Sequence, residues 1–156
     1  MSGTEDTFEA ARAVCLRLLA RREHSRLELQ RKLAARGFEF PTIAAVLAEC
    51  SDRGWQSDAR FAEGFVCARK AKGYGVNRIR QELRLRGVEA DLADSRDWMT
   101  DMDRVYTKKY RGKLAVTTPR ERASRARFLA QRGFTSSQIR DFFERLGVDG
   151  EYPDTD

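Results

Sequence analysis

A short motif occurs three times in the chain and constrains its fold more than any other feature. The sequences LAARGF, LRLRGV and LAQRGF occupy residues 33–38, 83–88 and 129–134, and their glycines lie 50 and 46 residues apart. Each copy has the pattern of a helix C-terminus: a core-facing leucine, an arginine that interacts with the negative end of the helix dipole, and a glycine that adopts the left-handed conformation. A period of this length predicts stacked helical repeats.

The starts of several helices are equally recognisable. Capping boxes begin at Ser25, Thr118 and Thr135, each with Glu or Gln three residues later. Pro119 occupies the first helical position, where its missing N–H does no harm. Amphipathic segments before and after each glycine complete three repeats of three helices. The predicted boundaries are 1–56, 57–102 and 103–148, followed by an acidic tail at 149–156.

The composition agrees with an all-α fold. The chain has only 3 prolines, and runs of Val, Ile and Thr are missing. Charged residues make up 35% of the chain, against about a quarter in a typical domain, which requires a large solvated surface relative to the core. We therefore expect an elongated array of three tandem three-helix repeats. Apolar residues mark the third helix of each repeat: Ile43, Val46 and Leu47 in the first, Leu92 and Trp98 in the second, and Ile139, Phe142 and Phe143 in the third.

Basic residues are concentrated in two blocks. Residues 69–86 carry seven basic side chains against one acid, and residues 104–132 carry ten against one. Charged helix faces are usually only solvated, but two such blocks in one small chain favour a polyanionic partner, nucleic acid or nucleoprotein. The side chains that we expect to face this partner, inferred from charge, are Arg69, Lys70, Lys72, Tyr74, Arg78, Arg80, Arg84, Lys108, Lys109, Arg111, Arg125 and Arg127.

No pattern in the sequence is typical of a catalytic or metal site. The single histidine, His24, precedes the Ser25 cap, where we expect a hydrophobic staple or an exposed position. The three cysteines are widely spaced among apolar residues and form no CxxC pair, so we expect small buried side chains at Cys15, Cys50 and Cys67. We predict no enzymatic activity, no cofactor and no metal. With no signal peptide or membrane span in the sequence, we expect a cytoplasmic protein.

The basic block around residues 73–75 has the form of a helix–turn–helix, which DNA readers also use. Specific base reading needs polar side chains that converge on base edges, and here only Asn77 and Gln81 accompany the arginines. This favours contacts to phosphates over the recognition of a sequence. A general DNA-binding helical protein therefore stays open as an alternative to a protein that binds a nucleoprotein.

Taken together, the ordered motifs resemble the RecX family, small regulators of the bacterial RecA recombinase, over about residues 10–147. The matching segments include REHS at 22–25, DARFA at 58–62, KGYG at 72–75, IRQEL at 79–83 and RFL at 127–129. The resemblance implies tandem three-helix repeats and no catalytic residues. It also implies that the chain binds RecA and its filament on single-stranded DNA, and restrains ATP hydrolysis, strand exchange and co-protease activity in DNA repair and the SOS response. We further expect a monomer whose direct binding to single- or double-stranded DNA is weak.

Overall fold

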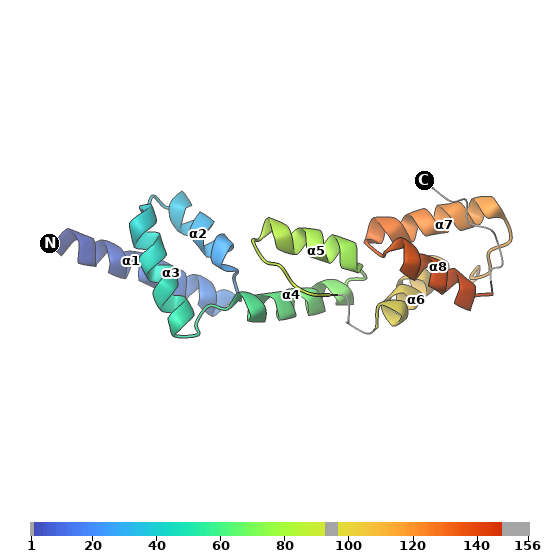
Figure 1. The fold of residues 1–156 in the computed structure, drawn as a ribbon, viewed down its shortest axis with the longest axis horizontal. Coiled ribbons are helices and arrows are strands. Elements are labelled where there is room, and N and C mark those ends of the chain that lie inside the picture. The colour runs from blue at the N-terminus through green and yellow to red at the C-terminus, as the bar shows by residue number, and fades with distance from the viewer. Residues whose placement is uncertain (1, 93–96, 148–156) are drawn as a thin grey trace. The chain divides into compact units, whose positions relative to one another are not determined.

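Helices account for all the regular secondary structure in the described part of the chain, which comprises residues 2–92 and 97–147 of a computed structural model (Figure 1). The predicted all-α class and the three-helix repeat are confirmed. The acidic tail predicted for 149–156 lies outside the described residues. The helices are α1 (Ser2–Arg21), α2 (Arg26–Ala35), α3 (Phe40–Asp52), α4 (Asp58–Ala71), α5 (Val76–Leu85), α6 (Trp98–Lys109), α7 (Pro119–Arg132) and α8 (Ser136–Arg145).

The chain divides into two compact units, and the division passes through α4 and α5. The first unit comprises residues up to 66 together with 82–90, and the second comprises 67–81 together with the residues from 91 onward. None of the helices found in the described ranges is both long and apolar enough to cross a bilayer.

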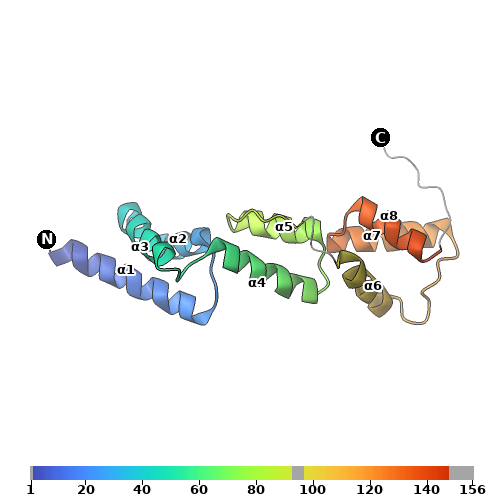
Figure 2. The ribbon, with the colours of Figure 1, turned by 60° about the horizontal axis from the view of Figure 1, so that its bottom comes forward.

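The core of the first unit lies among α1, α2 and α3, which pack together (Figure 2). Two of the cysteines belong to this core, as predicted: Cys15 and Cys50 are fully buried, and their Sγ atoms are 3.5 Å apart. Burial raises the pKa of the Cys15 thiol to about 12, so it stays protonated. The prediction was wrong for Cys67, which is exposed on α4. The remaining core residues are Ala11, Val14, Leu18, Leu29, Leu33, Ile43, Val46 and Leu47.

The capping box at Ser25 is confirmed, and it also joins α2 to the segment after α5. The Ser25 hydroxyl accepts from the Glu28 N–H at 3.1 Å and donates to the Arg86 carbonyl at 2.7 Å. His24 was expected to be a staple or exposed; it is 1% exposed, so the exposed alternative was wrong. Its Nδ1 lies 3.0 Å from the Arg22 carbonyl and its Nε2 lies 3.0 Å from Lys32 Nζ. An ammonium can only donate, so Nε2 accepts and Nδ1 carries the proton. Burial lowers the pKa of this imidazole.

The three repeated motifs end their helices as predicted. The φ angles of Gly37, Gly87 and Gly133 are +86°, +73° and +104°. In each copy the N–H of the following apolar residue donates to the carbonyl of the buried leucine five positions earlier, at 3.0–3.3 Å. This is the hydrogen bond of a Schellman motif, which satisfies a carbonyl that the helix leaves without a partner.

The third helix predicted for the second repeat differs from what the structure shows. Leu92 is buried in a segment without helical structure, and Trp98 begins α6. Trp98 was placed in the last helix of the second repeat, whereas Val105 and Tyr106 fall in the range predicted for the third repeat. All three lie on α6, so this placement of Trp98 was wrong. Both apolar groups fit a helical period, and periodicity alone does not show where one helix ends and the next begins. Residues 93–96 lie outside the described residues.

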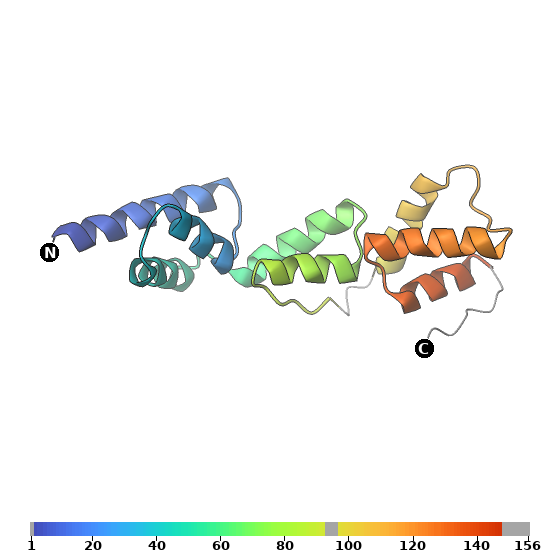
Figure 3. The ribbon, with the colours of Figure 1, turned by 90° about the horizontal axis from the view of Figure 1, so that it is seen from above.

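In the second unit, α8 packs against α6 and α7 (Figure 3). An aromatic cluster lies between α6 and α8. The Tyr106 ring contacts Phe142 and Phe143 with centroid distances of 5.1 and 6.3 Å. The turn between α4 and α5 contacts the turn between α7 and α8 through backbone hydrogen bonds. The N–H of Gly75 donates to the Arg132 carbonyl at 2.7 Å, and that of Asn77 donates to the Gly133 carbonyl at 2.8 Å.

Candidate nucleic-acid interface

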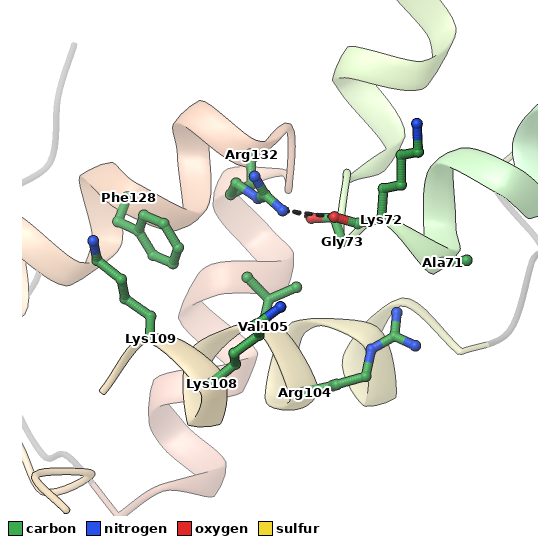
Figure 4. A pocket seen from close by; sticks show the side chains of 9 residues that line it. All are labelled: Ala71, Lys72, Gly73, Arg104, Val105, Lys108, Lys109, Phe128 and Arg132. Carbon is green, nitrogen blue, oxygen red and sulfur yellow. Dashed lines mark hydrogen bonds between the residues drawn. The ribbon is translucent and has the colours of Figure 1, made fainter. Parts of the chain in front are cut away.

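A pocket of about 490 Å³ opens in the second unit between the C-terminal end of α4, α6 and α7 (Figure 4). The lining residues of α6 and α7 are spaced four apart, and residues at this spacing lie on the same face of a helix. On α6 this spacing pairs Arg104 with Lys108 and Val105 with Lys109, and on α7 it pairs Phe128 with Arg132. The end of α4 contributes Ala71, Lys72 and Gly73.

Arg132 is held in place by the end of α4. Its Nε donates to the Gly73 carbonyl at 3.1 Å, and its Nη2 donates to the Lys72 carbonyl at 2.7 Å (Figure 4). Its guanidinium also lies 4.6 Å from the centre of the Tyr74 ring. These carbonyls follow the C-terminal end of α4, where the helix leaves carbonyls without partners, so Arg132 supplies the donors that they need. Because the acceptors are neutral carbonyls and not carboxylates, Arg132 keeps its positive charge at the pocket.

Tyr74 lies among three arginines of its own chain. Besides Arg132, the guanidinium of Arg78 lies 4.0 Å and that of Arg69 lies 5.3 Å from the ring centre. Cations over a tyrosine ring are attracted to its negative face, by about 0.5–1 kcal/mol each at exposed sites. The predicted partner-facing residues Arg69, Tyr74 and Arg78 are thus brought together, and they stabilise the turn between α4 and α5.

Lys70 and Arg104 share one acid at the edge of the pocket. Asp101 lies 3.3 Å from Lys70 Nζ and 3.3 Å from Arg104 Nη2, and the same Arg104 nitrogen donates to the Lys70 carbonyl at 2.8 Å. The Lys70 ammonium also lies 4.4 Å from the Trp98 ring centre, and its side chain is 20% exposed. Lys70 is therefore mostly engaged within the unit, whereas Arg104 is exposed.

Arg125 was predicted to face a partner, but the structure buries it. It is 7% exposed, its Nη1 donates to the Tyr106 hydroxyl and to the Leu114 carbonyl, and its guanidinium lies 4.3 Å from the Tyr110 ring centre. Burial raises the pKa of Tyr110, so this phenol stays neutral beside the arginine. Arg125 therefore acts inside the fold. Charge alone could not separate it from its exposed neighbours.

The other predicted residues have exposed or half-buried side chains. Lys72, Lys108 and Lys109 come together at the pocket, and among the described residues none forms an ion pair or hydrogen bond with their amines. Arg111 and Arg127 are exposed in the same unit outside the pocket, and α5 carries exposed Arg78 and Arg84 with half-buried Arg80. Of the pocket's charged and aromatic side chains, Arg104, Phe128 and Arg132 were not among the predicted residues. Their spacing predicts shared helix faces, but it does not predict that the faces meet.

The pocket can attract and hold an anion, because at least four of its cations have no carboxylate partner in the described part of the chain. Phe128 and Val105 add an apolar surface beside them. A group of three His, Cys, Asp or Glu side chains placed to hold a metal ion is not found within residues 2–92 and 97–147.

Comparisons with known proteins cover almost the whole chain. Three family models match in order: the first three-helix domain of RecX at residues 11–50, the second at 57–95 and the third at 103–143. The regulatory protein RecX of Chromohalobacter salexigens is 45% identical over 131 residues, which are 80% of this chain and 85% of that protein. The regulatory protein RecX of a Pseudomonas fluorescens strain is 39% identical over 155 residues, which are 96% of this chain and 99% of that protein.

Solved structures show the same fold. The crystal structure of RecX from Lactobacillus salivarius superposes with a TM-score of 0.79 at 16% identity, over 92% of this chain and 98% of that one. A second crystal structure of a regulatory protein RecX superposes with a TM-score of 0.74 at 18% identity, over 91% of this chain and 74% of that one. Three domain models in the right order, full-length relatives at about 40% identity and a shared fold all point the same way, and the chain belongs to the RecX family.

Proposed function

We propose that the chain is a non-enzymatic regulator, mainly an inhibitor, of the RecA recombinase. It binds the RecA filament on single-stranded DNA and lowers ATP hydrolysis, strand exchange and co-protease activity during DNA repair and the SOS response. The observation that carries the proposal is membership of the RecX family, whose relatives are named regulatory proteins and match nearly the whole chain.

The repeated fold suits a repetitive target. A filament presents the same surface on every subunit, and a chain with repeats at 1–56, 57–102 and 103–148 touches several neighbours at once. Each contact after the first is made at a high effective concentration, so modest contacts add up to stable binding. The exposed cations of the basic blocks supply such contacts, to acidic protein surface or to DNA phosphate. In this role the chain acts as a monomer in the cytoplasm.

The test is the DNA-dependent ATPase of the cognate recombinase, measured on circular single-stranded DNA. We expect the chain to hydrolyse no ATP alone and to lower the recombinase rate at molar ratios well below one, because one molecule at a filament end or groove affects many subunits. A matched assay adds the chain before and after the filament has formed. Inhibition that appears only when the chain is added first, at amounts that saturate the bare DNA, would mean simple competition for DNA and would refute the proposal.

A general DNA-binding role through phosphate contacts is the second candidate, and the pocket lysines that have no acidic partner among the described residues favour it. The two roles differ in their preferred target. A filament regulator binds DNA coated with recombinase more tightly than bare DNA, whereas a phosphate binder loses affinity when the recombinase covers the backbone. Binding to both forms, compared at one salt concentration, distinguishes them.

A further inference from the structure

The pocket of the second unit combines two features that one ligand class needs together. One is positive charge without a local counter-ion. In the described residues, Lys72, Lys108 and Lys109 have no acidic partner, and Arg132 donates only to carbonyls. Asp101, which pairs with Arg104 of the pocket, is already shared with a second cation, Lys70. The site therefore favours an anion.

The second feature is an aromatic ring at one end of this charge. Phe128 is half-buried, the Lys109 ammonium lies 5.3 Å from its ring centre, and Tyr110 contacts it nearly at right angles. In Figure 4, Phe128 and Lys109 lie at one end of the pocket, Lys72 and Arg104 lie at the other, and Lys108 and Val105 lie between them. A ligand that fills the pocket thus has an apolar planar part at one end and negative charge along the rest.

Alternative anions use only part of this arrangement. An acidic peptide is best recognised by a bidentate arginine, but two nitrogens of Arg132 already donate to carbonyls and Arg104 is paired with Asp101. The remaining lysines are point charges, which suit phosphate oxygens. Duplex DNA offers phosphates but keeps its bases stacked, so none of them reaches Phe128. A volume of about 490 Å³ lies within the range of pockets that enclose a small organic ligand.

We propose that this pocket binds one unstacked nucleotide of single-stranded nucleic acid. Its base lies against Phe128, and the flanking phosphates lie along Lys108 and Lys72. Stacking on an aromatic ring and a cationic track for the backbone are the two elements of sequence-independent single-strand binding. The site goes beyond the proposed regulation of the recombinase, which does not require the chain itself to touch DNA.

The test is the fluorescence anisotropy of labelled oligothymidylate with the full chain, across a salt series. Lys72→Gln with Lys108→Gln should lower the salt slope by about 1.4, because each single-strand phosphate contact contributes about 0.7. The matched control is Arg17→Gln with Arg21→Gln, which removes the same charge from exposed side chains of α1 that lie outside the pocket and outside both basic blocks. An equal change of slope in both double variants would overturn the proposal, because it would show that only total charge matters.

The base contact is tested with an abasic oligonucleotide of the same length. Wild type should bind it at least about five-fold more weakly than oligothymidylate, which corresponds to about 1 kcal/mol of stacking. Phe128→Leu should weaken binding to oligothymidylate by a similar factor and leave binding to the abasic strand unchanged. Circular dichroism checks that this variant folds. If wild type binds both strands equally, the proposal is wrong whatever the variant does. A chain that passes both tests but leaves the recombinase ATPase unchanged has the nucleotide site and refutes only the proposed regulation.

Discussion

Alanine at Gly133 should destabilise the chain far more than alanine at Gly37, although the two glycines occupy equivalent places in the repeated motif. Both have positive φ, and forcing an L-residue into that conformation costs about 1 kcal/mol. At Gly37 an added Cβ meets nothing within 4 Å. At Gly133 it lies 2.5 Å from the Arg78 Cβ, 2.7 Å from the Arg78 backbone nitrogen and 3.0 Å from the Gly75 carbonyl oxygen.

These atoms belong to the backbone or to a Cβ, so no side-chain rotation relieves the clash at Gly133. The two turns must separate instead, which strains or breaks the hydrogen bonds from Gly75 and Asn77, each worth about 1 kcal/mol. Overpacking adds about 1–3 kcal/mol. When the cost of the positive φ angle is added, Gly133→Ala should lower the free energy of unfolding by about 3–5 kcal/mol, whereas Gly37→Ala should lower it by about 1 kcal/mol.

Two further variants separate the contributions. Gly75 does not have a positive φ, but its added Cβ would lie 2.4 Å from the Gly133 carbonyl carbon. Gly75→Ala therefore measures the cost of the close contact alone, and it should lower the free energy of unfolding by about 2–4 kcal/mol. Gly64 lies in α4, and its Cβ would meet nothing within 4 Å. Gly64→Ala should therefore stabilise the chain by about 0.5–1 kcal/mol through helix propensity.

The measurement is urea unfolding followed by far-ultraviolet circular dichroism, with the free energy of unfolding taken at equal m values. If the two units unfold in separate transitions, Gly75→Ala and Gly133→Ala should lower the free energy of unfolding of the second unit's transition. A Gly133→Ala variant that loses no more than Gly37→Ala would refute the backbone docking of the two turns.

Three further predictions concern buried polar side chains. Because burial lowers the pKa of His24, the folded chain binds this proton less readily than the unfolded chain; stability is full above about pH 6.5 and falls below it. Urea unfolding at several pH values should show this fall, and His24→Gln should flatten it. Ser25→Ala removes the cap and the bond to the Arg86 carbonyl and should cost about 1–2 kcal/mol, whereas a loss below about 0.5 kcal/mol would contradict the cap. Arg125→Gln should cost about 2–3 kcal/mol by thermal unfolding, while Arg127→Gln, exposed two residues away, should change stability by less than about 0.5 kcal/mol; equal effects would mean that Arg125 is not buried.

The helix ends could be predicted from the sequence because their chemistry is local. The Ser25 and Thr135 boxes form both of their reciprocal hydrogen bonds. At Thr118 the hydroxyl accepts from the Glu121 N–H as predicted, and the Glu121 carboxylate also accepts from the N–H and the hydroxyl of Thr117. A capping hydrogen bond joins residues three apart, so the residues that make it are visible in a short window.

Burial and partners were predicted less well, because they depend on residues far along the chain. His24 lies in a polar stretch but is covered in the folded unit, and Cys67 follows an apolar residue on a helix but faces outward. Arg125 and Arg127 are two residues apart in the same basic block, yet only Arg125 meets the carbonyl and hydroxyl acceptors near α6. Residues two apart on a helix point in different directions, so which of them is buried depends on the packing of other helices.

The sequence by itself determined the family, the all-α class and the repeated left-handed glycine, since each depends on residue types at a short spacing. It also placed the positive charge in two blocks. Only the tertiary structure determined which distant residues each of these local features contacts. Gly133 ends α7 through its own motif, but it must be glycine for a second reason, the approach of Gly75 from 58 residues earlier in the chain. Likewise, Lys72, Lys108 and Phe128 form one pocket only because α4, α6 and α7 pack at that point, which hydrophobic burial across the whole unit determines and no short window contains.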